Sequence, residues 1–271
     1  MRIELHCHSH YSDGSLSPKE LIKKAEENAI KIFAITDHDN IDAYQELSQL
    51  KTNIKIVSGI EFSTSWNKIG IHIVGLNFDV HSEQLQQAIQ LQKQARISRA
   101  KIISAKLEKY GLSHVYEKIS SQDKVRQIGR PDFAQYLVKH GVFKDCEQAF
   151  KKFLGAGKPG DVKNQWLDLE KIVTVIRSAG GIAVLAHPFY YKLTNSKLKR
   201  LLTDFKNFGG EALEVVNGYQ NRDRTRYMLK LCTEFGLKAS IGSDFHRPTS
   251  WNKLGCDSRM LGDIDVVWNN F

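Results

Sequence analysis

The sequence lacks the features that mark membrane, secreted and fibrous proteins. No apolar run in its 271 residues approaches the roughly 20 residues of a membrane helix. The N-terminal stretch has no apolar core of the signal-peptide kind. The four cysteines are scattered, with neither CxxC spacing nor the density of a disulfide framework. Repeats and low-complexity stretches are absent too. We therefore expect a globular cytoplasmic protein without membrane contact.

Positive charge is unevenly distributed along the chain. The formal net charge is +9, and residues 82–160 hold 15 Lys and Arg against 7 Asp and Glu. The rest of the chain is nearly balanced, at 24 against 23. Such a segment is either a solvated helical surface or a basic lobe that attracts a polyanionic substrate. The charge count leaves both interpretations open.

Outside residues 82–160, strand and helix patterns alternate. Strands are expected at residues 2–8, 31–36, 55–62, 70–78, 182–186, 212–216 and 238–241. Helices are expected after Ser17-Pro18, over 168–179 and over 221–235. This alternation favours a mostly parallel α/β architecture.

Residues 82–160 interrupt that alternation. One long helix is expected over about 83–110, with shorter helices near 131–141 and 145–154. We therefore expect a main α/β domain made of 1–81 and 161–271, and a basic helical insertion of 82–160.

Histidines and carboxylates recur in or just after the expected strands. HCHSHYSDG opens the chain at residues 6–14, and alternate side chains of a strand share a face, so His6 and His8 project together. Glu61 interrupts an apolar strand, where a lone carboxylate would be costly. The ends of strands face the active site in barrel and α/β enzymes. The candidate metal ligands are His6, His8, Asp13, His38, Glu61, His72, His187, Asp244 and His246.

Nine ligands exceed what one tetrahedral ion takes and suit two or three ions. The two oxygens of Glu61 make it the natural bridge between ions. Mixed His and carboxylate ligation fits Mn, Zn or Fe. Such a cluster lowers the pKa of a bound water and clamps phosphoryl oxygens, so phosphate-ester hydrolysis is the leading reaction class. Amide hydrolysis in an amidohydrolase-type barrel stays possible on the same grounds.

These motifs resemble the PHP (polymerase and histidinol phosphatase) domain over almost the whole chain, and within it the TrpH/YciV-like group. The main motifs are His6-Cys-His8, Ser12-Asp13-Gly14, Thr36-Asp37-His38-Asp39, Gly59-Ile-Glu61, His72, Ala186-His187-Pro188 and Ser243-Asp244-Phe-His246. Further ones are Gly129-Arg130-Pro131, Gly157-Lys158-Pro159 and Glu214-Val-Val-Asn-Gly218. The resemblance implies a distorted (β/α)7 TIM-like barrel with a small inserted helical domain.

The resemblance also implies a trinuclear centre. Its ligand sets would be His6, His8, Glu61 and Asp244; Glu61, His72 and His187; and Asp13, His38 and His246. His10 would be a bystander. Two positions depart from the family pattern. Asp13 stands where many PHP proteins have His, and Asp132 stands where His often follows the Gly-Arg-Pro motif.

The implied activity is removal of the 3′-phosphate from nucleoside 3′,5′-bisphosphates, 5′→3′ trimming of short single-stranded RNA, or both. A metal-bridging hydroxide would attack phosphorus, with Glu61, Asp244 and His246 as catalytic residues. Arg99 and Arg130 are the expected substrate contacts, and Arg96 and Lys158 are further candidates.

Two alternatives stay open: a histidinol-phosphate-type phosphatase and a non-catalytic nucleic-acid-binding PHP protein. The basic segment argues against the first, because a small monoester does not need it. The complete set of nine ligands argues against the second. No obligate protein partner is evident from the sequence.

Overall fold

The computed structural model describes the whole chain except residues 122–126, 164 and 219. It divides into two compact units: Met1–Gln90 with Trp166–Phe271, and Leu91–Gln165. The domain limits expected from the sequence stay a prediction. No helix in the described part of the chain is both long and apolar enough to cross a membrane.

The elements follow the predicted order closely. The strands are β1 (Arg2–Glu4), β2 (Ile30–Phe33), β3 (Lys55–Ile56), β4 (Gly59–Trp66), β5 (Ile69–Leu76), β6 (Ile182–Leu185), β7 (Ala212–Asn217), β8 (Lys238–Gly242) and β9 (Cys256–Asp257). The α-helices are α1 (Pro18–Glu27), α2 (Ala43–Leu47), α3 (Glu83–Glu108), α4 (Val115–Ser120), α5 (Arg130–Lys139), α6 (Cys146–Ala149), α7 (Leu169–Ser178), α8 (Asn195–Asn207) and α9 (Arg222–Phe235). Short helical turns are η1 (Phe150–Leu154), η2 (Pro188–Tyr191), η3 (Ser258–Leu261) and η4 (Val267–Asn270).

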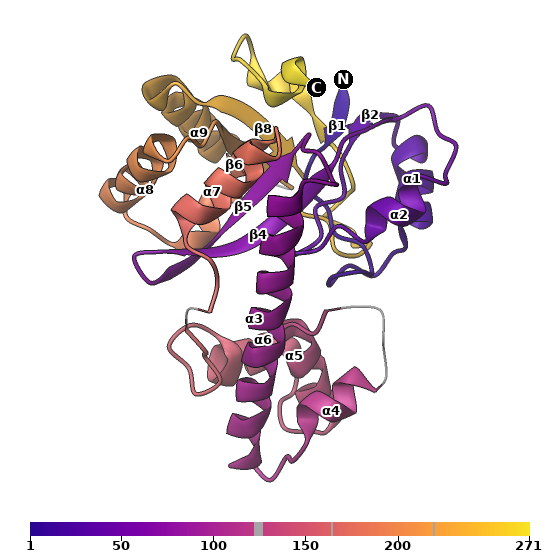
Figure 1. The fold of residues 1–271 in the computed structure, drawn as a ribbon, viewed down its shortest axis with the longest axis vertical. Coiled ribbons are helices and arrows are strands. Elements are labelled where there is room, and N and C mark those ends of the chain that lie inside the picture. The colour runs from indigo at the N-terminus through magenta and orange to yellow at the C-terminus, as the bar shows by residue number, and fades with distance from the viewer. Residues whose placement is uncertain (122–126, 164, 219) are drawn as a thin grey trace. The chain divides into compact units, whose positions relative to one another are not determined.

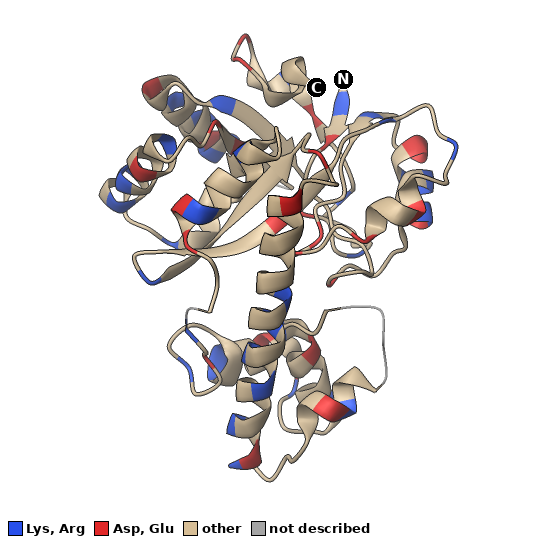
Figure 2. Ribbon diagram, in the orientation of Figure 1, with Lys and Arg blue, Asp and Glu red and all other residues tan. Residues whose placement is uncertain are grey.

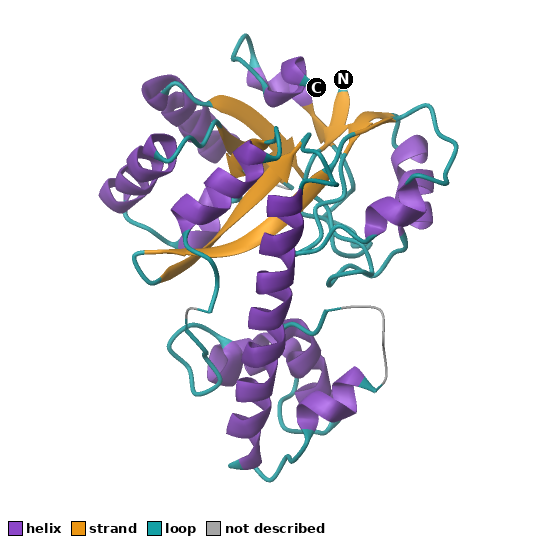
Figure 3. Cartoon of the chain, in the orientation of Figure 1, coloured by secondary structure: helices purple, strands orange, loops and turns teal. Residues whose placement is uncertain are grey.

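The strands of the first unit form two sheets (Figures 1 and 3). One has the order β3-β2-β1-β9 and the other β4-β5-β6-β7-β8. Neither closes on itself within the described residues. Two isolated parallel bridges link them just past strand ends, Cys7 with Phe245 and His38 with Glu61. The mixed α/β class is confirmed, whereas one closed seven-stranded sheet is not observed among these residues.

Strand β5 departs from the mostly parallel arrangement expected from the sequence. β4 runs antiparallel to β5, and β5 antiparallel to β6, so the sheet is mixed rather than mostly parallel. The cause is a two-residue hairpin turn at Asn67-Lys68, whose φ angles are +47° and +65°. Turns with two positive φ angles match the twist of paired antiparallel strands. The hairpin makes Glu61 and His72 diagonal neighbours on one face, because Ser63 pairs with His72.

Helices cover the outer faces of the sheets. Figure 1 shows α7, α8 and α9 against the five-stranded sheet, and α1 and α2 beside β2. The packed faces are apolar, as with Ile172 of α7 and Phe205 of α8, both fully buried. The expected start of α1 is confirmed. Ser17 is the N-cap residue, Pro18 is the first residue of the helix, and Ser17 and Glu20 form a reciprocal capping box.

The second unit is helical over its described residues. The C-terminal part of α3 packs with α4, α5 and α6 around Ile103, Phe133 and Phe153. Its surface carries many Lys and Arg, which Figure 2 shows recurring along α3. The three helices expected between residues 83 and 154 are confirmed, and α6 ends in a π-helical turn, η1.

Candidate metal centre

The structure brings all nine candidate ligands together in the first unit. His6 and His8 follow β1, His38 follows β2, Glu61 lies in β4 and His72 in β5. His187 follows β6, and Asp244 and His246 follow β8. Asp13 arrives from the turn that closes when Gly14 N–H donates to the Ser9 carbonyl at 2.9 Å. Ligand-type atoms of these nine residues form four overlapping groups, with separations within each group of no more than 4.8 Å.

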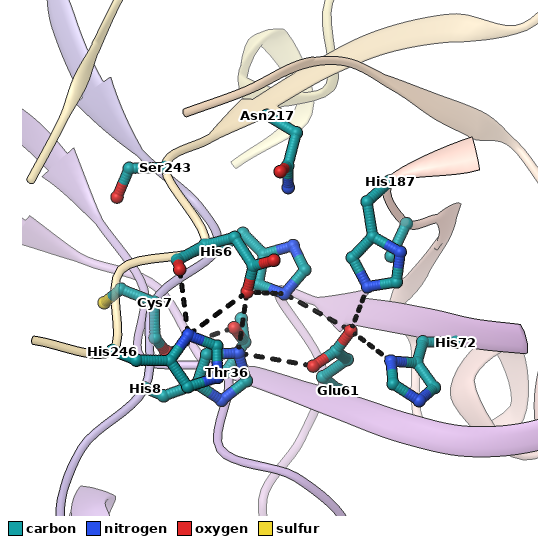
Figure 4. A network of polar contacts seen from close by, with 12 residues as sticks. His6, Cys7, His8, Thr36, Glu61, His72, His187, Asn217, Ser243 and His246 are labelled. Atoms are coloured by element: carbon teal, nitrogen blue, oxygen red, sulfur yellow. Dashed lines mark hydrogen bonds and ion pairs between the residues drawn. The ribbon is translucent and has the colours of Figure 1, made fainter. Parts of the chain in front are cut away.

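Glu61 is the centre of the cluster (Figure 4). Its side chain is 1% exposed, and five imidazoles surround it. Its Oε1 lies 2.8 Å from His72 Nδ1, 2.8 Å from His187 Nε2 and 3.3 Å from His6 Nε2. Its Oε2 lies 2.9 Å from His38 Nδ1 and 3.3 Å from His8 Nε2. The two oxygens therefore face different histidines, as a bridging carboxylate would.

Two aspartates complete the cluster. Asp244 Oδ1 lies 3.2 Å from His8 Nε2 and 3.5 Å from His6 Nε2. Asp13 Oδ1 lies 3.2 Å from His246 Nε2, and its Oδ2 lies 3.8 Å from His38 Nε2. A carboxylate at position 13 thus reaches the same histidines that the third ligand set contains.

The electrostatics of the cluster favour bound cations. Burial raises the pKa of Glu61, but the histidines around it outweigh burial and hold that pKa well below its ordinary value. Burial, with the positive charge of His246, lowers the pKa of His8 to about 3. Burial also lowers the pKa of His246, but Asp13 and Asp244 outweigh it and raise that pKa to about 10. The carboxylates thus stay ionised and draw positive charge into the cluster.

Buried polar atoms also fit metal ligation. Nε2 of His6, Nε2 of His8 and Oε2 of Glu61 are buried and make no hydrogen bond within the described residues. A buried polar atom without a hydrogen bond normally costs free energy, so such atoms need another partner. Neutral imidazole nitrogens and carboxylate oxygens are the ligating forms of these residues. The donor set fits divalent transition ions.

Comparisons with known proteins agree with this geometry. The family model described as the PHP domain matches residues 4–219. A 5′-3′ exoribonuclease of Haemophilus influenzae is 38% identical, covering 100% of this chain and 99% of that protein. A 3′,5′-nucleoside bisphosphate phosphatase of Chromobacterium violaceum is 37% identical over 91% of this chain and 87% of that protein. The chain belongs to the PHP family.

A solved structure supports the same assignment of fold. It is described as an amidohydrolase from Chromobacterium violaceum with bound sulfate. Its TM-score is 0.88 at 34% identity, and the match covers 100% of this chain and 95% of that one. The family expected from the motifs is confirmed, and phosphoester hydrolysis agrees with the names of the PHP relatives.

Two candidate ligands that follow strands have unusual backbone conformations. His187 has a φ of +26° and Asp244 a φ of +51°. Residues other than glycine rarely adopt positive φ, and such strain gathers at functional sites. Gly242 allows the close packing below them, because a β-carbon there would lie 2.2 Å from Cβ of His6.

Three buried carboxylates support the cluster; the sequence predicts that Asp37 orients His38, whereas it assigned no such role to Glu214 or Glu4. Glu214 Oε1 lies 2.9 Å from His6 Nδ1, and its Oε2 accepts from the His187 N–H at 2.6 Å. Asp37 accepts from Ser9 N–H at 2.7 Å and from the Ser12 hydroxyl at 2.6 Å, which fixes the loop before Asp13.

The third of these carboxylates is Glu4, beneath the cluster. It accepts from the N–H groups of His6, Ser243 and Gly255 at 3.0, 2.9 and 2.7 Å. Burial raises the pKa of Glu4 to about 7, against the opposing effect of these hydrogen bonds. Glu61 was predicted as a functional residue because it is a carboxylate inside an apolar strand. Glu4 and Glu214 also lie in apolar strands, so the same pattern could have identified them.

The remaining predicted residues are His10, Arg99 and Arg130. His10 belongs to none of the ligand groups found in the described residues, as expected for a bystander. Arg99 and Arg130 lie in the second unit. Arg130 begins α5, its guanidinium carbon lies 5.8 Å from the Phe150 ring centroid, and burial lowers its pKa. Asp132 accepts from the Gly129 N–H at 2.7 Å. Substrate contacts by the two arginines stay predictions.

Proposed function

We propose that this PHP protein is a metal-dependent phosphoesterase acting on nucleotides. Its substrates are nucleoside 3′,5′-bisphosphates, from which it removes the 3′-phosphate, the 5′ ends of short RNA, or both. The main support for this proposal is the position of the Glu61 carboxylate, which lies within 3.3 Å of five imidazoles. The names of the relatives from Haemophilus influenzae and Chromobacterium violaceum support these two substrate classes.

The nine residues would hold two or three ions of Mn, Zn or Fe. We assign three sets by the contacts that support them: His6, His8, Glu61 and Asp244; Glu61, His72 and His187; and Asp13, His38 and His246. Bound ions supply a water of lowered pKa and neutralise phosphoryl oxygens. Glu61 belongs to the first two sets, so its carboxylate would be shared between two ions.

His246 is suited to act at the leaving group. Its side chain is 29% exposed, at the accessible edge of the cluster. Its Nδ1 lies 2.9 Å from the Asp244 carbonyl oxygen, which leaves Nε2 directed towards Asp13. With Nδ1 fixed by the Asp244 carbonyl, Nε2 would either hold an ion of the third set or, where that position holds no ion, carry the proton for the departing oxygen. Glu61, Asp244 and His246 are the proposed catalytic residues.

We also propose that the two sheets of the first unit form one distorted seven-stranded barrel. The ring would run β1, β2, β4, β5, β6, β7, β8 and back to β1. Two backbone contacts support it: Asp39 N–H donates to the Glu61 carbonyl at 2.9 Å, and His8 N–H donates to the Phe245 carbonyl at 2.9 Å. These contacts join the strand ends across the two openings between the sheets.

The basic insertion, residues 82–160, is proposed to bind substrate phosphates other than the one hydrolysed. Arg99 and Arg130 would supply bidentate contacts, with Arg96 and Lys158 adding positive charge. The burial of the Arg130 side chain supports a fixed rather than a freely solvated cation.

The test is a paired assay of the full chain. 3′-Phosphoadenosine 5′-phosphate and a short 5′-monophosphorylated RNA are incubated with and without Mn²⁺. We expect Mn²⁺-dependent release of phosphate or of nucleotides, lost in Glu61→Gln and retained in the control His10→Ala. A metal-loaded protein that turns over neither substrate would contradict the proposal. Faster turnover of histidinol phosphate would favour the small-molecule phosphatase instead.

A further inference from the structure

An exposed aromatic ring lies beside the metal centre. Tyr190 belongs to η2, which begins directly after His187, and its side chain is 61% exposed. Its ring centroid lies 5.3 Å from that of His187, at an interplanar angle of 38°. His187 in turn contacts Glu61 at 2.8 Å. Of the large exposed apolar side chains in the described residues, Tyr190 is the one whose ring neighbours a candidate ligand.

The neighbours of Tyr190 hold it in this outward position. Phe189 packs against the main core, and the Tyr191 hydroxyl donates to the Ala186 carbonyl at 2.7 Å. The Tyr190 N–H donates to the His187 carbonyl at 3.0 Å. The middle residue of the three aromatics is therefore fixed through its backbone while its ring faces solvent. A fixed exposed ring binds a planar partner at low entropic cost.

A cation lies over the ring of Phe189, the residue next to Tyr190 in the chain. The Arg224 guanidinium carbon is 5.2 Å from the Phe189 ring centroid. Arg224 is exposed, and no ion pair of it is found in the described part of the chain. Two residues further along α9, Arg226 instead pairs with Asp223 at 3.2 Å. Arg224 is therefore held by an aromatic face and keeps its charge available to an anion.

The chain links the aromatic ring and the cation, because Phe189 and Tyr190 are consecutive residues of η2. The Tyr190 ring neighbours the candidate ligand His187, and Arg224 lies over the Phe189 ring. A nucleotide has the matching parts, a planar base and anionic phosphates.

We propose that Tyr190 and Arg224 form a nucleotide subsite at the edge of the metal centre. The base stacks on the Tyr190 ring, and Arg224 pairs with a phosphate that is not hydrolysed. This inference rests on the proposed nucleotide phosphoesterase activity, and it names residues of the first unit that select nucleotides over simpler phosphate esters. Stacking of bases on aromatic side chains tolerates any base, as an enzyme acting on varied RNA ends requires.

The test compares matched variants of the full, Mn²⁺-loaded chain. Tyr190→Ala and Arg224→Ala are measured beside Tyr190→Phe, Trp251→Ala and Arg226→Ala. Trp251 is a suitable control because it is 68% exposed and lines a different cavity, of about 450 Å³, with Met260. KM and kcat are measured with 3′-phosphoadenosine 5′-phosphate and with glycerol 2-phosphate, which has no base. Calorimetric titration with adenosine 5′-monophosphate gives affinity independently of turnover.

We expect Tyr190→Ala to weaken nucleotide binding about 5- to 100-fold and to raise KM for 3′-phosphoadenosine 5′-phosphate far more than KM for glycerol 2-phosphate. Arg224→Ala should weaken it less, and Tyr190→Phe should retain it because the ring remains. Unchanged nucleotide affinity in Tyr190→Ala would refute the subsite, as would an equal loss in Tyr190→Phe or a loss in Trp251→Ala alone. If the unsubstituted protein turns over no nucleotide, the proposed function itself fails, which is a separate result.

Discussion

The Glu214 carboxylate holds the ring of His6 from behind: its Oε1 lies 2.9 Å from Nδ1, while Nε2 of the same ring faces Glu61. A carboxylate can only accept, so Nδ1 carries a proton and Nε2 is the nitrogen that would ligate an ion. Histidines that ligate metals usually have such a partner, which fixes the ring and increases its basicity. The pair thus ties β7 to the first residue of the cluster.

The first prediction concerns Glu214→Gln. The amide nitrogen would face a donor at His6 or at the His187 N–H, so the His6 ring would lose its fixed orientation. We expect metal affinity to fall about 10- to 100-fold, as is usual for partners of ligating histidines. Metal titration followed by calorimetry measures this. Glu211→Gln is the control, since the Glu211 side chain is 38% exposed and its Oε2 lies 3.8 Å from Lys238 Nζ, away from the candidate ligands. Equal affinities in the two variants would disprove the positioning role.

Chelation should destabilise the protein. Ions that bind only the folded chain stabilise it by about 2.7 kcal/mol when present at 100 times their dissociation constant. Removing them leaves Glu61, Asp13 and Asp244 close together with only histidine protons to balance them. We expect a lower Tm after exhaustive chelation, restored by Mn²⁺ or Zn²⁺ but not by Mg²⁺, which prefers oxygen ligands. An identical Tm before and after chelation would exclude a tightly held centre.

Gly242→Ala tests the packing beneath His6. The added β-carbon would lie 2.2 Å from Cβ of His6, and both atoms belong to rigid strand regions. We expect a loss of about 1–3 kcal/mol in the free energy of unfolding, together with weaker metal binding. Gly70→Ala is the matched control in a strand, since a β-carbon there meets nothing within 4 Å. The midpoints of urea unfolding are compared between Gly242→Ala and Gly70→Ala. Similar midpoints would show that the backbone around His6 accommodates the added β-carbon without loss of stability.

The cysteines should differ sharply in reactivity. Cys146 is exposed, whereas Cys7, Cys232 and Cys256 are buried. Burial raises the pKa of the Cys232 thiol to about 12, and burial also raises the pKa values of Cys7 and Cys256 well above the ordinary value. Since the thiolate is the reactive form, one thiol should react with a disulfide reagent at pH 8 in the folded protein. All four should react after unfolding, and rapid labelling of Cys232 in the native state would contradict this picture.

Most of the candidate site could be predicted because many of its residues can be recognised one at a time from their local sequence. Glu61 and His72 are polar residues inside apolar strands, and His187 and Asp244 directly follow such strands. The ends of strands converge in this class of fold. Residues at strand ends were therefore expected to lie close together in space even where they are far apart in the sequence. Asp13 needed the turn at Gly14, which is also a local signal.

Other features depended on information that local patterns do not carry. The direction of β5 was missed because Asn67-Lys68 is a weak hairpin signal without glycine, and only the observed positive φ angles reveal the turn. The role of Glu214 depends on a contact with His6, 208 residues away. Tyr190 carries no signal at all in the sequence, since an aromatic after His-Pro is equally consistent with core packing. Its exposure is a property of the folded surroundings.

The order of the ligands along the chain has a consequence for biosynthesis. The cluster begins at His6 and ends at His246, with every partner strand between them. During translation, His6 and His8 are therefore synthesised long before Asp244 and His246. Until then His6 and His8 offer only an incomplete binding place. The full set of candidate ligands therefore exists only once Asp244 and His246 have been synthesised, and a fragment that stops before β8 would lack both of them.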